Sequence, residues 1–323
     1  VDAFRSLGRP NLFFGVTAGN MDSMVNHYTS DKKIRSNDAY TPNGQAKQRP
    51  DRAVSVYAHR CREAYKDVPI IIGGIEASLR RIAHYDYWSD TVKKSLLLDS
   101  KADLLVYGNA ERQIVEIAHR LAKGDAISEL LGIRGTAHFV KTLPEGFDIK
   151  DASDIELSAK PLPEINPYSH EPDCATRSAE EAQGSQAIHA PMLSKKLRSQ
   201  TVIRLPSFEQ VREDKVLYAH ASRIMHAETN PFNARYLIQQ HSTRWVWINP
   251  PPLPLTTPEM DYVFDLPYAR TPHPHYGKAN VPAFEMIQHS VNIMRGCFGG
   301  CSFCSITEPV SYTHLRAHET RED

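Results

Sequence analysis

The sequence predicts an α/β fold, because short apolar runs alternate with longer stretches of helical periodicity. Three apolar runs, at residues 12–16, 68–74 and 102–108, read as buried strands, and each carries glycine at or near its end. Helical stretches are expected at residues 53–66 and 111–121, and the second places its apolar side chains on one face. This order predicts a parallel sheet whose carboxyl edge carries the ligand sites.

Two glycine-containing loops are the candidate binding segments of this sheet. Residues 73–78 follow the second strand, and residues 107–111 follow the third. These loops can line a ligand site, or their glycines can serve only as turn residues, and the pattern leaves both interpretations open. No G-x-G-x-x-G fingerprint occurs, which argues against a nicotinamide or flavin site.

The segment 84–90 is unusually rich in polar aromatic and acidic side chains. Such side chains can line a substrate pocket, but tyrosine and tryptophan more often cap a core while their polar atoms reach water or backbone. We therefore expect a packing role at this helix–loop junction and keep Asp86 and Asp90 as secondary site candidates. For Arg80 and Arg81, a solvated helix surface is a more common role than an anion site.

Composition places the chain among ordinary globular proteins. It has 323 residues, 41% hydrophobic and 24% charged, and its 38 basic residues balance 38 acidic ones. Because the net charge is zero, the protein has no overall positive electrostatic potential that would attract nucleic acid, and no clear nucleic-acid surface is expected. No apolar run is long enough to cross a membrane, and the first residues lack the order of a signal peptide. Five cysteines, three of them clustered, fit a reducing cytoplasm.

The second half of the chain changes character. Residues from about 151 to 200 are rich in Pro, Ser, Ala, Glu and Lys, which predicts a linker. Strands are expected at residues 201–206 and 245–249, with a mostly helical stretch at 208–225 that has a break-prone middle. The proline run at 250–254 predicts a stiff, extended connector.

These patterns divide the chain into five parts. We expect a Rossmann-like α/β domain at 1–135 that lacks its true N-terminus, since the chain starts at Val1 and a strand follows almost at once. A loop and flexible linker at 136–200, an α+β connector at 201–282, and a final strand and cysteine loop at 283–308 follow. Residues 309–323 resemble a translated sequencing-adapter peptide and are expected to be a foreign tail.

The most specific chemical feature is the cysteine loop, where Cys297, Cys301 and Cys304 follow a C-x3-C-x2-C spacing. Three closely spaced thiolates can hold three irons of a 4Fe-4S cluster and leave the fourth iron open to a small molecule. A zinc site needs a fourth ligand, which Cys61, Cys174 or a histidine would supply. A disulfide framework does not suit three neighbouring cysteines. The preceding apolar residues 284–294 read as a buried strand that delivers the loop.

Together with its aromatic residue before the last cysteine, this loop resembles that of the radical S-adenosylmethionine superfamily. Long stretches at residues 11–22, 73–81, 84–90 and 290–297 narrow the resemblance to the YgiQ-type proteins of that superfamily. The resemblance implies that the three cysteines hold a 4Fe-4S cluster whose open iron is chelated by S-adenosylmethionine. One electron would then cleave the sulfonium to methionine and a 5'-deoxyadenosyl radical.

The resemblance carries further expectations. It implies that the backbone around Phe303 lies near the adenine, and Gly299 and Gly300 would let the loop wrap closely around the cluster. It also implies a partial α/β barrel, of which residues 283–308 are the first strand and the cluster loop, and an electron donor such as a flavodoxin or ferredoxin. The substrate stays unknown. We expect the full-length protein to be an enzyme and this shorter chain to bind the cluster weakly at best, without turnover.

Two alternatives stay open beside this interpretation. The glycine loops look like those of a cobalamin-binding domain, but the D-x-H-x-x-G motif that would supply a cobalt ligand does not occur. The other alternative is a non-catalytic ligand-binding protein whose cysteines hold structural zinc. Replacing the cysteines would distinguish the cluster from structural zinc. Loss of a cluster ligand should leave the first domain folded, whereas loss of a structural zinc ligand should unfold the protein, because structural zinc contributes to folding.

Overall fold

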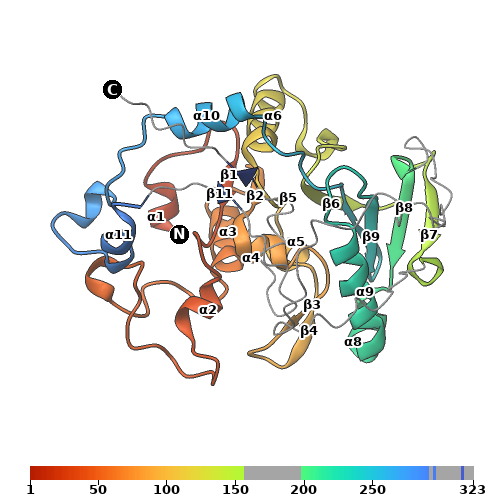
Figure 1. Ribbon diagram of the computed structural model, residues 1–323, viewed down its shortest axis with the longest axis horizontal. Helices are drawn as coiled ribbons and strands as arrows, with labels where there is room; N and C mark the ends of the chain where they lie inside the picture. The colour runs from red at the N-terminus through yellow and green to blue at the C-terminus, as the bar shows by residue number, and fades with distance from the viewer. Residues whose placement is uncertain (156–197, 291–293, 296–313, 316–323) are drawn as a thin grey trace, which may run out of the picture.

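One mixed sheet of eight strands runs through the described part of the chain (Figure 1). The structure is a computed structural model, and it describes residues 1–155, 198–290, 294–295 and 314–315. The strands follow one another across the sheet in the order β1-β2-β5-β6-β10-β9-β8-β7. Their bounds are β1 Phe14–Val16, β2 Ile70–Ile72, β5 Leu104–Val106, β6 Thr136–Val140, β7 Asp148–Asp151, β8 Thr201–Leu205, β9 Tyr236–His241 and β10 Arg244–Ile248.

The sheet is parallel at its two ends and antiparallel in its middle. At one end, β1, β2 and β5 run parallel, with Phe14 opposite Ile70 and Ile71 opposite Leu104. At the other end, β7, β8 and β9 run parallel as well. Between them, β6 is antiparallel to both β5 and β10, and β10 is antiparallel to β9. The predicted α/β class is confirmed, while a uniformly parallel sheet is not what forms.

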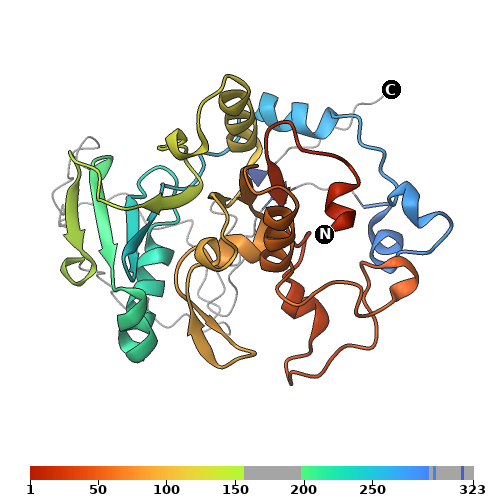
Figure 2. The ribbon, with the colours of Figure 1, turned by 180° about the vertical axis from the view of Figure 1, so that it is seen from behind.

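Helices cover both faces of the β1-β2-β5 end. Successive side chains of a strand point to opposite faces, so Ile70 and Ile72 pack into one core and Ile71 into another. Helix α3 (Ala53–Ala64) contributes to the first core, and α6 (Glu111–Ala122) contributes Ile117 to the second. Both helices begin and end close to the predicted bounds. The reverse view shows the same layering from behind (Figure 2).

The remaining helices lie around the sheet. Their bounds are α1 Asp2–Arg5, α2 Ser23–His27, α4 Gly74–Leu79, α5 Leu96–Asp99, α8 Phe208–Glu213, α9 Lys215–Ala227, α10 Thr257–Asp265 and α11 Pro282–Ile287, with a 3-10 turn η1 at Pro42–Gly44. The predicted break in the stretch 208–225 is confirmed. It falls at Asp214, whose carboxylate caps α9 by accepting from the backbone N–H groups of Val216 (2.7 Å) and Leu217 (3.4 Å).

The predicted linker at 136–200 is wrong over its first part, because β6 and β7 lie in it and both belong to the sheet. β6 pairs with β5 on one side and with β10 on the other. The expected domain at 1–135 and connector at 201–282 therefore share one continuous sheet. Polar Thr136 and His138 obscured β6 in the sequence, although both are buried in the fold. Residues 156–197 lie outside the described chain.

The expected strand at residues 284–294 also differs from the structure. Residues Pro282–Ile287 form helix α11, and Met286 and Ile287 are 81% and 60% exposed. Pro282 at the first helical position presets the helical backbone angle, and the N–H of Ala283 donates to the carbonyl of Ala39 at 2.8 Å. Strand β11 is confined to Met294–Arg295. A buried barrel strand does not form over the described residues of this segment.

Two residues of the segment 309–323, which the sequence predicts to be a foreign tail, pair with β11. Strand β12 (His314–Leu315) is antiparallel to β11, with Met294 opposite Leu315 and Arg295 opposite His314. The pairing satisfies backbone hydrogen bonds of β11 that would otherwise lack a strand partner. A ladder of two residues on each strand adds little stability by itself.

Candidate functional site

The carboxyl edge of the parallel strands β1, β2 and β5 is where the sequence places ligand-binding loops. Because these strands run parallel, the turns that follow them meet at one edge of the sheet. The turn after β1 leads into α2, the turn after β2 leads into α4, and the turn after β5 leads into α6. Figure 1 shows β11 close to α6, the helix that follows β5.

The glycine pair after β2 allows two of these turns to touch. Gly74 has a backbone φ of +79°, and a Cβ atom at this position would lie 2.3 Å from Thr17 Oγ1 in the turn after β1. A side chain on Gly73 would contact the Val106 carbonyl at 3.4 Å. The glycines therefore permit close packing of turn against turn, which is the turn interpretation of this loop.

Glu76, in the same loop, is a buried carboxylate with a structural role. It is 2% exposed, and its Oε2 accepts from the backbone N–H (3.0 Å) and hydroxyl (2.7 Å) of Ser23 at the start of α2. Its Oε1 accepts from the N–H of Val54 at the start of α3 (3.1 Å). One side chain thus holds the first turns of two helices in fixed positions.

The predicted surface role of Arg80 and Arg81 is wrong. Arg81 is 3% exposed, donates to the Ser78 carbonyl at 2.6 Å and lies 4.8 Å from the centre of the Tyr107 ring. Arg80 forms an ion pair with Asp22, the N-cap of α2. Both arginines thus tie the end of α4 to neighbouring turns of the same edge.

The segment 84–90 forms a β-hairpin, not a helix–loop junction, from β3 (His84–Asp86) and β4 (Thr91–Lys93). Asp86 is buried and accepts from Arg52 (2.6 Å) and Ser89 (2.5 Å), and it lies 3.0 Å from Lys93. Burial by itself raises the pKa of this carboxyl, but these three partners together hold it well below its usual value. Asp86 therefore stabilises the hairpin.

Asp90, the other acidic candidate of the hairpin, accepts from the Tyr85 hydroxyl at 2.6 Å. This hydrogen bond raises the pKa of Tyr85. The contact joins β3 to the connection between the two strands, where Asp90 has a positive φ of 52°. The expected packing role of the segment fits the contacts of both aspartates.

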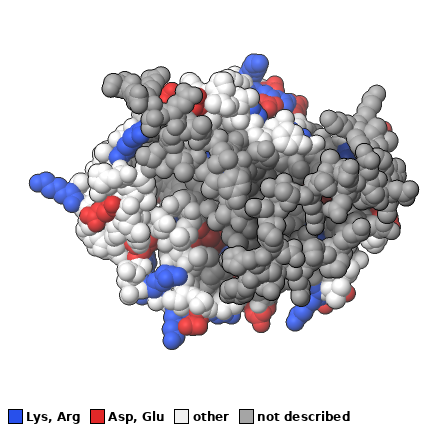
Figure 3. All heavy atoms as spheres, viewed as in Figure 1, with Lys and Arg blue, Asp and Glu red and all other residues white. Residues whose placement is uncertain are grey.

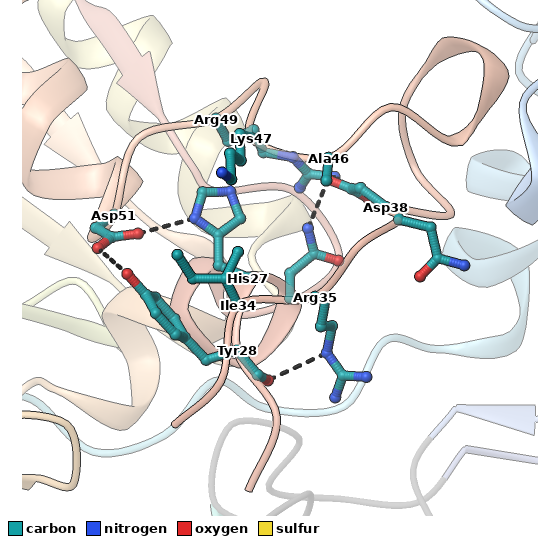
Figure 4. Close-up of a pocket in the computed structure, with 11 residues that line it drawn as sticks. His27, Tyr28, Ile34, Arg35, Asp38, Ala46, Lys47, Arg49 and Asp51 are labelled. Atoms are coloured by element: carbon teal, nitrogen blue, oxygen red, sulfur yellow. Dashed lines mark hydrogen bonds and ion pairs between the residues drawn. The ribbon is translucent and has the colours of Figure 1, made fainter. Parts of the chain in front are cut away.

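A cavity that the sequence did not indicate lies beside α2, with a volume of about 290 Å³. Figure 4 shows His27 and Asp51 facing each other across one side of it, with Arg35, Lys47 and Arg49 around it. His27 ends α2, and the other side chains come from the long connection between α2 and α3. No spacing in the sequence links His27 to Asp51, because the fold of that connection brings them together.

The loop after β5 forms the junction to the segment that precedes the cysteines. Arg295 of β11 forms an ion pair with Glu111, the first residue of α6, and its guanidinium lies 5.6 Å from the centre of the Phe264 ring in α10. The next residue of α6, Arg112, binds Glu259 of α10 through two nitrogens. The first turn of α6 therefore binds both α10 and β11.

Tyr107, at the start of this loop, is buried. Its hydroxyl donates to the Asn249 carbonyl, and burial raises the pKa of Tyr107 to about 12. Its backbone N–H donates to the Gly135 carbonyl at 2.8 Å. Of the candidate loop at 107–111, Glu111 is the residue that reaches toward the cysteine-bearing segment.

Comparison with known protein families identifies the family of this chain. The model of the family described as Radical SAM N-terminal matches residues 1–290, most of the chain. The chain belongs to the radical SAM N-terminal family. The resemblance to YgiQ-type proteins is confirmed by relatives named UPF0313 proteins, which are about 60% identical.

Three curated relatives of this radical SAM N-terminal chain give the extent of the match. A UPF0313 protein of Vibrio vulnificus (strain YJ016) is 62% identical over 309 residues, which are 94% of the chain and 40% of that protein. The UPF0313 protein of Vibrio cholerae is 60% identical over 307 residues, covering 95% and 39%. That of Pseudomonas aeruginosa is 59% identical over 317 residues, covering 95% and 42%. The chain thus spans about two fifths of the length of these relatives, and no solved structure matches it significantly.

The predicted ligands of the radical SAM cluster, Cys297, Cys301 and Cys304, lie outside the described residues. The same holds for Phe303, Gly299 and Gly300. Arg295 is the described side chain nearest to them in sequence. Within the described ranges, no group of three or more His, Cys, Asp or Glu side chains is arranged to hold a metal ion.

Cys61, one of the residues that could complete a zinc site by sequence, has a position that does not suit that role. It is 3% exposed and belongs to the core that α3 forms with the sheet. Burial raises the pKa of its thiol, whereas a metal ligand must be a thiolate. Cys174, the other isolated cysteine, lies outside the described residues.

Two further properties of the radical SAM N-terminal chain concern its surface. No described helix combines the length and the apolarity needed to cross a bilayer. On the face shown in Figure 3, basic and acidic side chains alternate over the described surface. This mixture agrees with the equal numbers of acidic and basic residues in the sequence.

Proposed function

We propose that the chain is the part of a radical S-adenosylmethionine enzyme that binds a 4Fe-4S cluster through Cys297, Cys301 and Cys304. The single observation that carries the proposal is this C-x3-C-x2-C loop in a chain of the radical SAM N-terminal family. Three thiolates leave one iron for the amine and carboxylate of S-adenosylmethionine. When bound, cluster and S-adenosylmethionine supply one-electron cleavage of the sulfonium to methionine and a 5'-deoxyadenosyl radical.

The chain's own residues would hold and position these cofactors. Gly299 and Gly300 allow the loop backbone to approach the cluster, and the backbone at Phe303 would face the adenine. The contacts of Arg295 with Glu111 and Phe264 support this proposal, because they fix the stem of the loop two residues before Cys297. The stem lies at the carboxyl edge of the parallel strands, where ligands of α/β sheets bind.

The Rossmann-like character of the first domain is part of the proposal. β1, β2 and β5 are parallel, and helices on both faces connect or follow them, as in half of such a fold. Cobalamin is not included. The sequence lacks the D-x-H-x-x-G motif that would supply a cobalt ligand.

The partners and the compartment follow from the same chemistry. The cluster requires a one-electron donor, and we assign that role to a small flavodoxin or ferredoxin. Five cysteines, with Cys61 unpaired in the core, suit the reducing cytoplasm.

The substrate belongs to the full-length protein, since the chain spans about two fifths of its relatives' length. Turnover is therefore proposed for the full-length protein.

Anaerobic reconstitution with iron and sulfide tests the cluster. The wild-type chain should gain 4Fe-4S absorbance and, once reduced, a paramagnetic resonance signal that changes when S-adenosylmethionine is added. Cys297→Ala, Cys301→Ala and Cys304→Ala should each lose the signal and keep the circular dichroism of the wild type. Cys61→Ala is the matched control and should keep the cluster. One tightly bound zinc in place of iron, with unfolding of the three loop variants, would instead favour the structural zinc alternative.

A further inference from the structure

The cavity beside α2 is lined by His27, which has one ring nitrogen bound to Asp51 and the other without a partner among the described residues. The His27 side chain is 10% exposed, and its Nδ1 lies 2.8 Å from Asp51 Oδ1. The other oxygen of Asp51 accepts from the Tyr28 hydroxyl at 2.7 Å. A carboxylate only accepts hydrogen bonds, so Nδ1 carries a proton that it donates to Asp51, and Nε2 can donate to an anion once the ring is protonated at both nitrogens. Nε2 has no hydrogen-bond partner among the described residues.

The position of this histidine is fixed by the core. Glu76 holds Ser23 at the start of α2, the five-residue helix that His27 ends, and it holds Val54 at the start of α3. The hydroxyl of Ser23 also accepts from the N–H of Ala53 at 3.0 Å. Asp51 stands two residues before α3, so the same carboxylate fixes both members of the His27–Asp51 pair. A rigid frame of this kind is what a binding side chain needs.

The charges around the cavity favour an anion. Three basic side chains and two acidic ones line it, which leaves one net positive charge before His27 is counted. Both carboxylates are already occupied, because Asp51 binds His27 and Tyr28, and Asp38 accepts from Asn26 at 2.7 Å and from Arg49. Lys47 makes no hydrogen bond or ion pair with another described residue. Toward other described residues, the Arg35 guanidinium uses only its Nε, which donates to the Tyr28 carbonyl at 3.1 Å.

The cavity also has an apolar wall. Ile34 and Ala46 line it, and Ile34 is 56% exposed. A volume of about 290 Å³ lies at the lower end of the range for small-molecule sites. A ligand with an apolar group beside its anionic group would cover Ile34, whereas an inorganic ion would leave it in water.

We infer that this cavity binds a small organic phosphate, with Lys47, Arg35 and the free Nε2 of His27 around the phosphate and Ile34 beside its organic group. Lysine, arginine and protonated imidazole are the donors that bind phosphate in proteins, and arginine offers two parallel donors to its oxygens. The site lies after β1, on the carboxyl side of the sheet, where the ligand sites of α/β folds occur. It requires no iron, so its test is independent of the cluster.

Titration of the 323-residue chain with phenyl phosphate tests the site. The ring signals of His27 in proton–nitrogen spectra should shift, and calorimetry should give a tighter dissociation constant for phenyl phosphate than for inorganic phosphate. Benzoate should bind more weakly and phenol not at all. Lys47→Gln and Arg35→Gln should each weaken phenyl phosphate roughly tenfold or more, the usual loss for a charged hydrogen bond. His27→Gln should do the same if its melting curve shows that it folds.

Lys33→Gln is the matched control, because Lys33 is an exposed cation of the same connection and does not line the cavity. It should leave binding unchanged. The inference is overturned if Lys33→Gln weakens binding as much as Lys47→Gln, because that result means general charge attraction. Unshifted His27 signals at saturating phenyl phosphate would also overturn it, and so would benzoate binding as tightly as phenyl phosphate.

Discussion

Arg295 and Glu111 form an ion pair across 184 residues of sequence, and this pair joins the stem of the cysteine loop to the first turn of α6. The two side chains are 20% and 28% exposed, so water screens the pair only in part. Phe264 lies against the same guanidinium. The pair thus connects the proposed cofactor loop to the carboxyl edge of the sheet, the place where the fold itself favours ligands.

Replacing Glu111 with Gln should loosen β11. The neutral amide cannot form the ion pair, and a half-buried pair of this kind contributes about 1 kcal/mol. Hydrogen exchange should therefore become faster in the peptide that contains Met294 and Arg295, and less iron should be retained after reconstitution. Glu116→Gln, an exposed change in the same helix, is the control and should alter neither quantity. Equal exchange rates in the two variants would show that the pair does not hold the loop stem.

Replacing Glu76 with Gln should destabilise the whole fold. The carboxylate accepts through both oxygens, whereas glutamine has one accepting oxygen and would turn its amide group toward a buried donor. We expect a loss of about 2–4 kcal/mol in the free energy of unfolding, measured in urea. Glu63→Gln, on the exposed face of α3, should change it little. An unchanged urea midpoint for Glu76→Gln would contradict the role that we assign to this residue.

Two glycine substitutions separate backbone strain from steric contact. Gly74 and Gly124 have φ angles of +79° and +98°, but a Cβ atom at Gly124 meets nothing within 4 Å, while one at Gly74 lies 2.3 Å from Thr17 Oγ1. Gly124→Ala should therefore lower the free energy of unfolding by about 1 kcal/mol, which is the cost of placing alanine at a positive φ. Gly74→Ala should lower the free energy of unfolding by clearly more, because Thr17 or the turn must also move. Urea unfolding of both variants measures the difference, and equal costs would show that the two turns do not pack closely.

Acid should weaken the fold through buried histidines. Burial lowers the pKa of His138 and of His241 to about 4, below the ordinary value of 6.5 that applies when the chain unfolds. Below pH 6.5 the unfolded chain binds protons that the folded chain excludes, so stability is full above that pH and falls as pH drops toward 4. Phenylalanine at position 241 can keep the stacking on Phe208 but cannot take up a proton. His241→Phe should therefore reduce the loss in the free energy of unfolding between pH 7 and pH 4 by up to about 3 kcal/mol. His226→Phe, on a helix surface, serves as the comparison in the same urea titrations.

Local sequence was enough for the elements that have strong periodicity. The triple isoleucine of β2 and the single apolar face of α6 predict a buried strand and a covering helix, and both form where expected. The cysteine spacing likewise depends only on residues of one loop, so it could indicate a cluster without any fold. By contrast, β6 contains Thr136 and His138 at buried positions, and its strand character comes from its two neighbours in the sheet.

The sequence by itself determined the α/β class and the main helices, and it predicts the cluster chemistry proposed for the cysteine loop, because these depend on residue type and short-range spacing. Only the tertiary structure decided that one sheet unites the two predicted domains and that Pro282–Ile287 forms a helix. It also decided that His27 meets Asp51 and that Arg295 meets Glu111. Such contacts join residues that are 24 and 184 positions apart, and the distance between them is set by how whole elements pack.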